Sequence, residues 1–437
     1  MPSDMSSRIP GFFKLSVDER RAVVEERTGL PEGALAAAGE RGLDVVTSDK
    51  TVENVLGTYA LPFAATLNVQ VNGREVIVPM VIEEPSVVAA ASNAARMVRD
   101  GGGFVAEADP PIVVAQIQLV DVEDAESASE RILARREDIL AMADAAVPGL
   151  VARGGGARDL VVRVLGAPSD RMMVVDVLVD CRDAMGANLV NSIAEGVGDE
   201  LALLARGRCN FRILSNLADR RCVRVTCRVP FEALATEELS GADVARGMEE
   251  GSRFAELDPY RACTHNKGIM NGIDAVVIAT GNDWRAVEAG AHAYAARSGR
   301  YSPLATWRRD GDHLVGKIEL PMALGIVGGT LRVHPTARLS LAMTGVTNAA
   351  ELGMIAASVG LAANLAALRA LASDGIQRGH MGLHARSVAI AAGATGDLVE
   401  KVAARICELG DVTVDSARAV LAEEQARSDK DTIAVAE

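Results

Sequence analysis

An α+β fold is predicted, in which a small domain is inserted into a larger, mostly helical domain and a helical segment ends the chain. Three observations support this. The chain has 437 residues, 49% of them apolar, so it can bury more than one core. Residues 112–214 carry their own regular order of strand and helix patterns. A long apolar helical pattern, 347–373, is then followed by a break at Asp374-Gly375.

The inserted unit contains, in order, a strand, a helix, two strands, a helix and a strand. The corresponding residues are 112–120, 123 to about 145, 160–165, 172–179, 187–205 and 211–214. This βαββαβ order is the ferredoxin-like pattern. We therefore predict a small domain over 111–215, a large domain over 1–110 and 216–374, and a mobile C-terminal segment over 375–437.

The large domain shows two hairpin signals and several helical patterns. Asn72-Gly73 lies between alternating runs over 67–80, which is typical of a two-residue hairpin. Gly101-Gly102-Gly103 ends a helical pattern. The remaining expected elements are helices at 87–100, 241–255, 284–297 and within 335–373, strands at 223–229 and 275–279, a hairpin at 306–320, and two helices after 375.

Composition excludes several classes of protein. The net charge is -14 and no basic patch with interleaved aromatics is present, which disfavours nucleic-acid binding. The N-terminus has no apolar signal region. The apolar stretch Thr347–Ser373 contains Glu351, Asn364 and Arg369, so we expect a buried helix and no membrane span. The cysteines have no ligand-like spacing, so we expect free thiols, no metal and a cytoplasmic location.

Two polar constellations stand at helix starts, and each has a structural alternative. Glu83-Glu84-Pro85-Ser86 lies where a strand pattern meets a helix pattern. A partly buried carboxylate there can donate a proton, or Glu and Ser can cap the helix. The stretch 180–188 is a Gly-containing turn whose free N–H groups suit a pyrophosphate, or Asp183 caps the following helix. No G-x-G-x-x-G opens a βαβ unit, so an ordinary Rossmann domain is not predicted.

Two further constellations concern a lysine and an aspartate. The polar run 258–268 contains Lys267, which could stabilise an oxyanion in a dry pocket. The run could equally be a solvated loop. Asp283, in Thr280–Arg285, follows the expected short strand. It could pair with a buried lysine, or cap the next helix.

The last two constellations are rich in glycine. Leu324–Thr330 suits close backbone approach to a ligand or a tight turn. His380 and His384 are four residues apart, but Gly379 and Gly382 argue against a shared metal-binding helix face. His380 fits better as an acid on a mobile segment, or as a partly buried structural histidine.

Taken in this order, the constellations resemble the hydroxymethylglutaryl-CoA reductase family, and the missing membrane anchor resembles its soluble, class II branch. The resemblance runs from Glu53–Gly57 to His380-Met381, and it is most specific in Asp183–Asn188, Arg261–Gly272 and Thr280–Arg285. It implies a large domain with a central helix and a small ferredoxin-like domain that binds the nicotinamide cofactor. It also implies a homo-oligomer built from dimers.

The resemblance carries residue roles to matching positions. The catalytic residues would be Glu84, Lys267, Asp283 and His380. The hydroxymethylglutaryl group would be held by Ser86, Arg261 and Asn271, with Asn216 close to the reacting centre. The dinucleotide site would be lined by Asp183, Met185, Gly186 and Asn188. Asp144 is the nearest carboxylate before the GGG loop, Gly154-Gly155-Gly156, and residues 141–150 contain no Arg or Lys, so we expect NAD(H) to be preferred over NADP(H).

The implied reaction interconverts hydroxymethylglutaryl-CoA and mevalonate plus CoA through two hydride transfers. Lysine would stabilise the oxyanion, histidine would protonate CoA thiolate, and glutamic acid would supply the last proton. One alternative is an oxidoreductase for another acyl-CoA or an aldehyde. Another is a non-catalytic CoA-binding protein of the same fold, although binding alone does not need all four catalytic residues.

Overall fold

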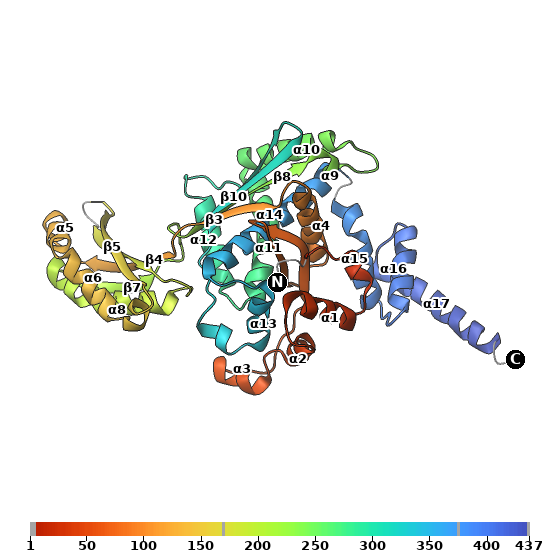
Figure 1. The fold of residues 1–437 in the computed structure, drawn as a ribbon, viewed down its shortest axis with the longest axis horizontal. Coiled ribbons are helices and arrows are strands. Elements are labelled where there is room, and N and C mark those ends of the chain that lie inside the picture. Colours follow the sequence, from red (N-terminus) through yellow and green to blue (C-terminus); the bar gives the residue numbers. More distant parts are fainter. Residues whose placement is uncertain (1–5, 168–170, 374–375, 435–437) are drawn as a thin grey trace.

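The computed structural model describes residues 6–167, 171–373 and 376–434, with side chains left out of the description at 39–41, 330, 376–383 and 427–434. Its buried apolar side chains form separate cores in a large central body, in the insert and in the C-terminal helices. Figure 1 shows the insert and the C-terminal helices at opposite ends of the longest axis, with the large body between them.

A six-stranded sheet runs through the large body in the order β2-β1-β3-β8-β10-β9. Its neighbours are antiparallel, except that β1 and β3 are parallel. The expected hairpin is confirmed, because Asn72 (φ 51°) and Gly73 (φ 76°) make its left-handed turn. The strands are β1 (Phe63–Val71), β2 (Arg74–Val81), β3 (Phe104–Ala108), β8 (Cys222–Pro230), β9 (Ala305–Asp310) and β10 (His313–Pro321).

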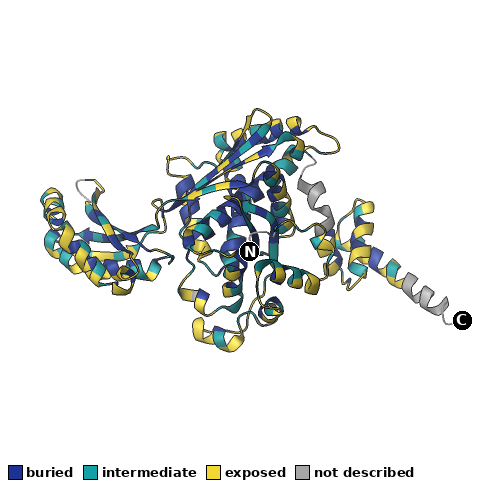
Figure 2. Ribbon diagram, viewed as in Figure 1, coloured by how far each residue is buried: buried dark blue, intermediate teal, exposed yellow. Residues whose placement is uncertain are grey.

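Two long helices cross behind this sheet. Helix α14 (Ala349–Ala372) is long and apolar enough to cross a membrane, yet 67% of its most apolar window is buried inside the structure. It packs against α11 (Pro259–Ala279), and both lie in the dark, buried centre of Figure 2. Gly272 permits the crossing, since a Cβ there would lie 2.7 Å from the Val359 carbonyl oxygen. The expectation of a buried helix in this region is confirmed.

Shorter helices surround this centre. Helix α4 (Val87–Asp100) has the predicted bounds and packs on β1 and α14. The N-terminal helices were not predicted. The remaining helices of the large body are η1 (Phe12–Lys14), α1 (Val17–Thr28), α2 (Ala34–Arg41), α3 (Val45–Thr51), α9 (Phe231–Leu234), α10 (Gly241–Leu257), α12 (Trp284–Ala295), η2 (Gly329–Arg332) and α13 (Pro335–Thr344).

The insert has the predicted βαββαβ order. Its four strands are antiparallel in the order β5-β6-β4-β7, as a ferredoxin-like fold requires. The strands are β4 (Ile112–Val120), β5 (Gly156–Leu165), β6 (Met172–Asp180) and β7 (Arg208–Leu214), and the main second-half helix is α8 (Ala187–Ala205).

The single helix expected over 123–145 is wrong. The chain forms α5 (Ala125–Ala134) and α6 (Arg136–Ala145), followed by the short α7 (Pro148–Val151). Arg135 breaks the helix at φ -105°, ψ 18°. Its guanidinium pairs with Asp138 at 2.5 Å, and acidic residues in the first turn of α6 favour a new helix start there.

The strand expected over 275–279 is wrong, and the solvated loop left open for 258–268 is not what the structure shows, because both stretches belong to α11. Asp258 accepts hydrogen bonds from the N–H groups of Tyr260 and Arg261, and Pro259 at the first position favours the start. The short apolar run is the buried end of this helix, since such a run fits a buried helix as well as a strand.

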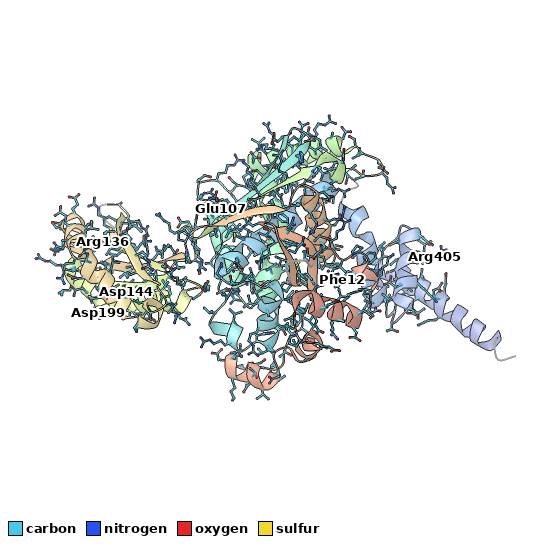
Figure 3. All side chains as sticks on the ribbon, in the orientation of Figure 1. Phe12, Glu107, Arg136, Asp144, Asp199 and Arg405 are labelled. Carbon is cyan, nitrogen blue, oxygen red and sulfur yellow. The ribbon has the colours of Figure 1, made fainter. Side chains whose placement is uncertain are left out.

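The C-terminal part has three helices where two were expected: α15 (Ile376–Ala391), α16 (Leu398–Glu408) and α17 (Val414–Ala434). Buried apolar side chains from all three form their own small core. Figure 3 places Arg405 on this unit and Asp144 and Asp199 on the insert, at opposite ends of the molecule.

Candidate active site

Lys267 and Glu84 meet where α11 passes the turn between β2 and α4. The Nζ of Lys267 lies 2.5 Å from Oε2 of Glu84. Asn271, one helical turn after Lys267, donates to the same oxygen at 3.3 Å. The Lys267 and Glu84 side chains remain 60% and 41% exposed, so an incoming substrate can reach both. A positioned ammonium and a carboxyl group suit oxyanion stabilisation and proton transfer.

Two residues after Glu84, Ser86 adopts a backbone conformation that is rare for serine. Its φ is 75°, in the left-handed region, which costs on the order of 1–3 kcal/mol for a residue other than glycine. Ser86 is the N-cap residue of α4, but its side chain makes no capping hydrogen bond. Its hydroxyl is buried and has no partner among the described residues. The Ser86 hydroxyl thus keeps its hydrogen-bonding capacity two residues from Glu84, and the capping alternative for serine is not what the structure shows.

Arg261 lies near the start of α11, and its positive charge faces no counter-ion among the described side chains. Its side chain has no hydrogen bond or ion pair within the described parts of the chain, although its backbone N–H is bonded to Asp258. Partial burial lowers the pKa of the Arg261 guanidinium. An unpaired, half-buried guanidinium is well suited to a carboxylate or phosphate of a ligand.

The polar side chains in the middle of α11 explain why this polar stretch is a packed helix. His265 is buried, with Nε2 3.1 Å from the Ala305 carbonyl oxygen. Asn266 is also buried, donating to the Ser302 carbonyl oxygen at 3.0 Å and accepting from the Leu304 N–H at 2.8 Å. These bonds satisfy the Asn266 amide and one ring nitrogen of His265 inside the core, whereas Nδ1 of His265 is buried without a partner among the described residues. Lys267 follows on a more exposed part of the helix surface and reaches the site.

Asp283 is not bonded to Lys267. Its carboxylate accepts from the Ala286 N–H at 3.0 Å and so caps α12, the alternative that the sequence left open. The Arg285 guanidinium lies 4.0 Å from Oδ1 of Asp283. The preceding residue, Asn282, accepts from the Gly325 N–H at 2.7 Å. Asp283 thus begins the helix that packs beside α11.

The turn before α8 presents free N–H groups. Gly186 is the N-cap residue at φ 112°, and no side chain caps the helix. The N–H groups of residues 187–189 have no bonded partner in the described chain. A Cβ at position 186 would lie 2.6 Å from the Cys181 sulfur, so glycine is required. Met185 and the exposed Asn188 flank the same turn. An uncapped helix start suits the phosphates of a dinucleotide.

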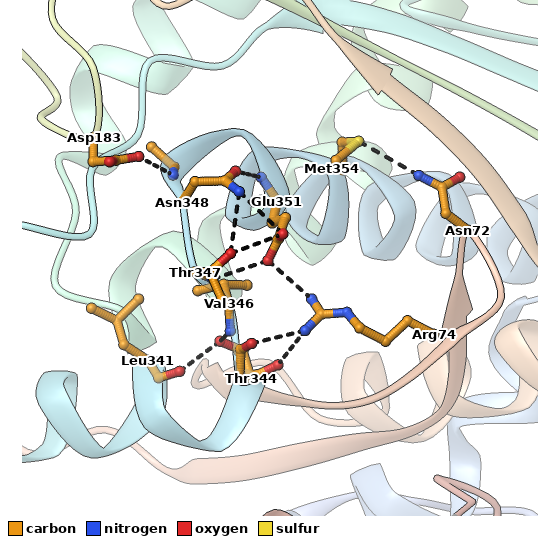
Figure 4. A network of polar contacts seen from close by, with 12 residues as sticks. Asn72, Arg74, Asp183, Leu341, Thr344, Val346, Thr347, Asn348, Glu351 and Met354 are labelled. Atoms are coloured by element: carbon orange, nitrogen blue, oxygen red, sulfur yellow. Dashed lines mark hydrogen bonds and ion pairs between the residues drawn. The ribbon is translucent and has the colours of Figure 1, made fainter. Parts of the chain in front are cut away.

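Asp183 does not cap α8, contrary to the structural alternative raised above. Its carboxylate instead accepts from the Ala349 N–H at 2.9 Å, at the start of α14. Figure 4 shows this contact beside Asn348, which caps the same helix through the Glu351 N–H. Asp183 therefore ties the turn before α8 to the central helix of the large body.

Arg221 reinforces this junction and was missed by sequence reasoning. It is 5% exposed and donates to the carbonyl oxygens of Ala184 at 3.0 Å and Leu324 at 2.6 Å. Burial lowers its pKa. Its partners are backbone atoms distant in sequence, so no motif could reveal it. A cavity of about 270 Å³ lies beside it, lined also by Asp109, Asp183 and the start of α14.

Of the three remaining expected residues, neither Asn216 nor Asp144 forms a hydrogen bond or ion pair with Lys267 or Glu84. Asn216 is exposed on the segment between β7 and β8. Asp144 accepts from the Ala157 N–H at 2.7 Å and so fastens the GGG loop. His380 belongs to α15 by its backbone, but its side chain lies outside the described residues.

Comparison with known proteins places these features in a family. A family model described as hydroxymethylglutaryl-coenzyme A reductase matches residues 16–385. The chain belongs to the hydroxymethylglutaryl-coenzyme A reductase family. The 3-hydroxy-3-methylglutaryl-coenzyme A reductase of Archaeoglobus fulgidus is 46% identical over 95% of this chain and 94% of that protein. A probable reductase of Borreliella burgdorferi is 34% identical over 77% of each chain.

Solved structures agree with this family assignment. A reductase from Streptococcus pneumoniae matches with a TM-score of 0.81 and 40% identity over 95% of this chain and 99% of that chain. Another structure of the S. pneumoniae enzyme is described as class II and bound to NADPH, with a TM-score of 0.80 and 42% identity over 83% of this chain and 99% of that chain. The expected class II membership is confirmed, and the chain is a nicotinamide-dependent oxidoreductase of the hydroxymethylglutaryl-CoA reductase family.

Proposed function

We propose that Glu84, Lys267, Asp283 and His380 carry the interconversion of hydroxymethylglutaryl-CoA and mevalonate plus CoA in this chain. The observation that carries the proposal is the contact of Lys267 with Glu84, joined by Asn271. It brings an ammonium and a carboxyl group from distant parts of the sequence into one site. Two residues after Glu84, the Ser86 hydroxyl has no partner among the described residues.

In the reductive direction, a bound reduced nicotinamide would supply hydride to the thioester carbonyl carbon and later to the aldehyde carbon. Lys267 stabilises the negative charge on the carbonyl oxygen at each transfer. To do so, its ammonium turns from Glu84 toward the substrate oxygen. Asp283 completes the polar surroundings of Lys267 once the substrate is bound.

The two remaining residues handle protons. His380 protonates the sulfur when the hemithioacetal expels CoA thiolate, since histidine changes charge near neutral pH. Glu84 in its acid form gives the proton that converts the aldehyde oxygen to the mevalonate hydroxyl. Because His380 would be needed after the first hydride transfer, we assign residues 375–437 to a flap that brings it to the site.

The substrate would be recognised by side chains whose hydrogen-bonding groups or charges are not fully used within the described chain. Arg261 would pair with the carboxylate of the hydroxymethylglutaryl group, and the buried hydroxyl of Ser86 would bond to the same group. Asn271 would contact it beside Lys267, and Asn216 would face the reacting carbon. The large body, 1–110 and 216–374, would thus bind this group and CoA.

The small domain, 111–215, would bind the nicotinamide dinucleotide. The uncapped start of α8 supports this assignment, with Asp183, Met185, Gly186 and Asn188 around it. We further propose that NAD(H) is preferred over NADP(H), because residues 141–150 offer Asp144 and no cation to a 2′-phosphate. The related S. pneumoniae structure was bound to NADPH, so a phosphate contact from Arg153 or a nearby arginine is the competing outcome.

The active unit would be a homo-oligomer built from dimers. The supporting observation is an exposed apolar segment before β1, where Leu56 is 103% and Tyr59 is 90% exposed. Neighbouring exposed apolar side chains can form the kind of patch that marks an association surface. A second copy would also supply a cofactor domain or a flap to a site that one chain leaves open. We place this enzyme in the cytoplasm.

One assay tests the proposed function. Purified protein should oxidise NADH or NADPH only when hydroxymethylglutaryl-CoA is added, and should reduce NAD or NADP with mevalonate and CoA. Acetyl-CoA and simple aldehydes serve as controls for the other acyl-CoA or aldehyde activities. Folded protein without turnover in either direction, with both cofactors tried, would exclude the proposal.

A further inference from the structure

The glycine-rich stretch Leu324–Thr330 has no part in the proposed chemistry, and its glycines serve two different purposes. Gly328 (φ 86°) and Gly329 (φ 49°) are left-handed, and an added Cβ would meet nothing within 4 Å at either position, so they form a turn. At Gly325 an added Cβ would instead lie 2.5 Å from the backbone nitrogen of Met185. Glycine at this position therefore permits close approach to another part of the protein, the turn before α8.

Residues 324–326, the bridge segment, are bonded to this turn through the backbone. We call residues 183–186 the cofactor turn, after the role proposed for them. The N–H of Ile326 donates to the carbonyl oxygen of Asp183 at 2.9 Å. A Cβ on Gly325 would also lie 3.2 Å from that oxygen. The two segments can therefore keep this separation only if position 325 carries no side chain.

The bridge segment is also bonded to the junction between α11 and α12. The N–H of Gly325 donates to Oδ1 of Asn282 at 2.7 Å. Asn282 is itself held in place, because its N–H donates to the Val277 carbonyl oxygen, near the end of α11, at 3.0 Å. The next residue is Asp283, the N-cap of α12. The bridge segment thus links the cofactor turn to the position of Asp283.

Arg221 ties the bridge segment to the cofactor turn a second time. Its guanidinium donates to the carbonyl oxygen of Leu324 at 2.6 Å, and to those of Ala184 at 3.0 Å and Met185 at 3.4 Å. The residue is buried, and within the described ranges it forms no ion pair. A planar guanidinium with several fixed donors can bond two backbone segments at once, which the single ammonium of lysine does less well.

We propose that Arg221 is a positioning residue, which holds the cofactor turn against the bridge segment and thereby sets the distance between the dinucleotide site and Asp283. The inference rests on the proposed function, which assigns the cofactor turn to the dinucleotide and Asp283 to catalysis. Arg221 acts through backbone oxygens and need not touch substrate or cofactor.

This role predicts a larger effect on reaction rate than on cofactor binding. The dinucleotide would be held by the start of α8, which belongs to the insert and does not need Arg221 for its own N–H groups. Without Arg221 the bound cofactor would be displaced relative to Asp283. A displacement of reacting groups by about 1 Å can cost about 100-fold in rate.

The first test compares wild type with Arg221→Met, Arg221→Lys and Gly325→Ala. The measurements are kcat with hydroxymethylglutaryl-CoA and the Kd of NADH and NADPH, from the change in cofactor fluorescence on binding. We expect kcat to fall about tenfold or more in Arg221→Met and Gly325→Ala, with Kd within about threefold of wild type. Arg221→Lys should lie between these variants and wild type, because one ammonium can still bond one of the two segments.

Two matched controls accompany these variants. Arg228→Met removes an arginine that is 48% exposed on β8, the strand that follows Arg221. Gly251→Ala adds a Cβ on α10 at an ordinary contact distance, 3.4 Å from Leu368. Both should keep the wild-type kcat and Kd. If Arg221→Met does not fold, Arg221→Lys and Gly325→Ala carry the test.

The double variant Arg221→Met/Gly325→Ala separates positioning from unrelated structural damage. Both substitutions break the same contact, so the double variant should lose about as much kcat as the worse single variant. Losses that multiply would overturn the proposal. It would also be overturned by kcat within about threefold of wild type in both single variants, or by a rise in Kd that accounts for the whole loss.

A second measurement does not depend on turnover. The amide hydrogens of Gly325 and Ile326 are hydrogen-bonded, so they should exchange slowly with solvent in wild type. Their exchange should become faster, on the order of tenfold, in Arg221→Met and stay unchanged in Arg228→Met. Unchanged exchange in Arg221→Met, with normal turnover in wild type, would reject the positioning role alone. Wild-type protein without turnover with either cofactor would instead reject the proposed function.

Discussion

The ammonium of Lys267 and the carboxylate of Glu84 are in direct contact, with 2.5 Å between Nζ and Oε2. The contact connects α11 to the turn that leads from β2 into α4. Asn271 holds the same carboxylate oxygen, so the two groups are fixed by one helix face and one strained turn. A substrate oxygen that binds Lys267 must replace Glu84 as its partner.

Lys267→Ala should abolish both hydride steps. Loss of a principal oxyanion stabiliser costs on the order of 100-fold or more in turnover. The measurement is kcat for hydroxymethylglutaryl-CoA and, separately, for free mevaldehyde. Lys317→Ala is the control, because Lys317 is exposed on β10 and should leave both rates unchanged. A Lys267→Ala enzyme with near-normal kcat would remove lysine from the mechanism.

Asp283 can be tested for two separate roles, helix capping and catalysis. Asp283→Ala removes the cap of α12 and should cost about 0.5–2 kcal/mol of stability. Asp283→Asn can still cap the helix, so its unfolding midpoint should stay near that of wild type. We expect turnover to fall in both variants, because neither keeps the carboxylate that we propose completes the surroundings of Lys267 once the substrate is bound. Full turnover in Asp283→Asn would show that Asp283 caps the helix and has no role in catalysis.

His380→Gln should strongly lower kcat for reduction of hydroxymethylglutaryl-CoA. It should leave kcat for reduction of mevaldehyde largely unchanged, because that reaction releases no thiolate. The measurement is kcat with each substrate. His384→Gln, four residues later, should be mild with both. Equal loss of both reactions in His380→Gln would mean that His380 acts in hydride transfer or cofactor binding.

Gly272→Ala should destabilise the packing of α11 on α14. The added Cβ would lie 2.7 Å from the Val359 carbonyl oxygen, and such overpacking costs about 1–3 kcal/mol. Gly268→Ala is the matched control on the same helix, since its nearest neighbour would be 4.0 Å away. It should be neutral or stabilise the chain by about 0.5–1 kcal/mol. Denaturant unfolding measures both, and equal effects would refute the close helix crossing.

Cofactor preference is tested by kcat/KM with NADH and NADPH. We expect the higher value with NADH, because a 2′-phosphate near Asp144 would meet a negative charge. Arg153→Ala should leave the NADH value unchanged. A higher kcat/KM for NADPH that falls in Arg153→Ala would show that Arg153 binds the phosphate instead.

The sequence by itself determined the elements whose patterns are local. The Asn72-Gly73 hairpin, the bounds of α4 and α8, and the βαββαβ order of the insert follow from alternation, helical periodicity and turn residues, which act over a few positions. Its motifs also pointed to the family and to Glu84 and Lys267 as candidates.

Tertiary structure decided what depends on distant partners. Residues 259–279 form one helix because His265 and Asn266 find backbone partners at the start of β9 and just before it. The sequence left a solvated loop open for 258–268 and predicted a strand over 275–279. Arg221 is buried because carbonyl oxygens from two other segments accept its bonds. Asp183 binds α14 instead of capping its own helix. Hydrogen bonds of this kind join groups far apart in the sequence, so their partners exist only once the chain has folded.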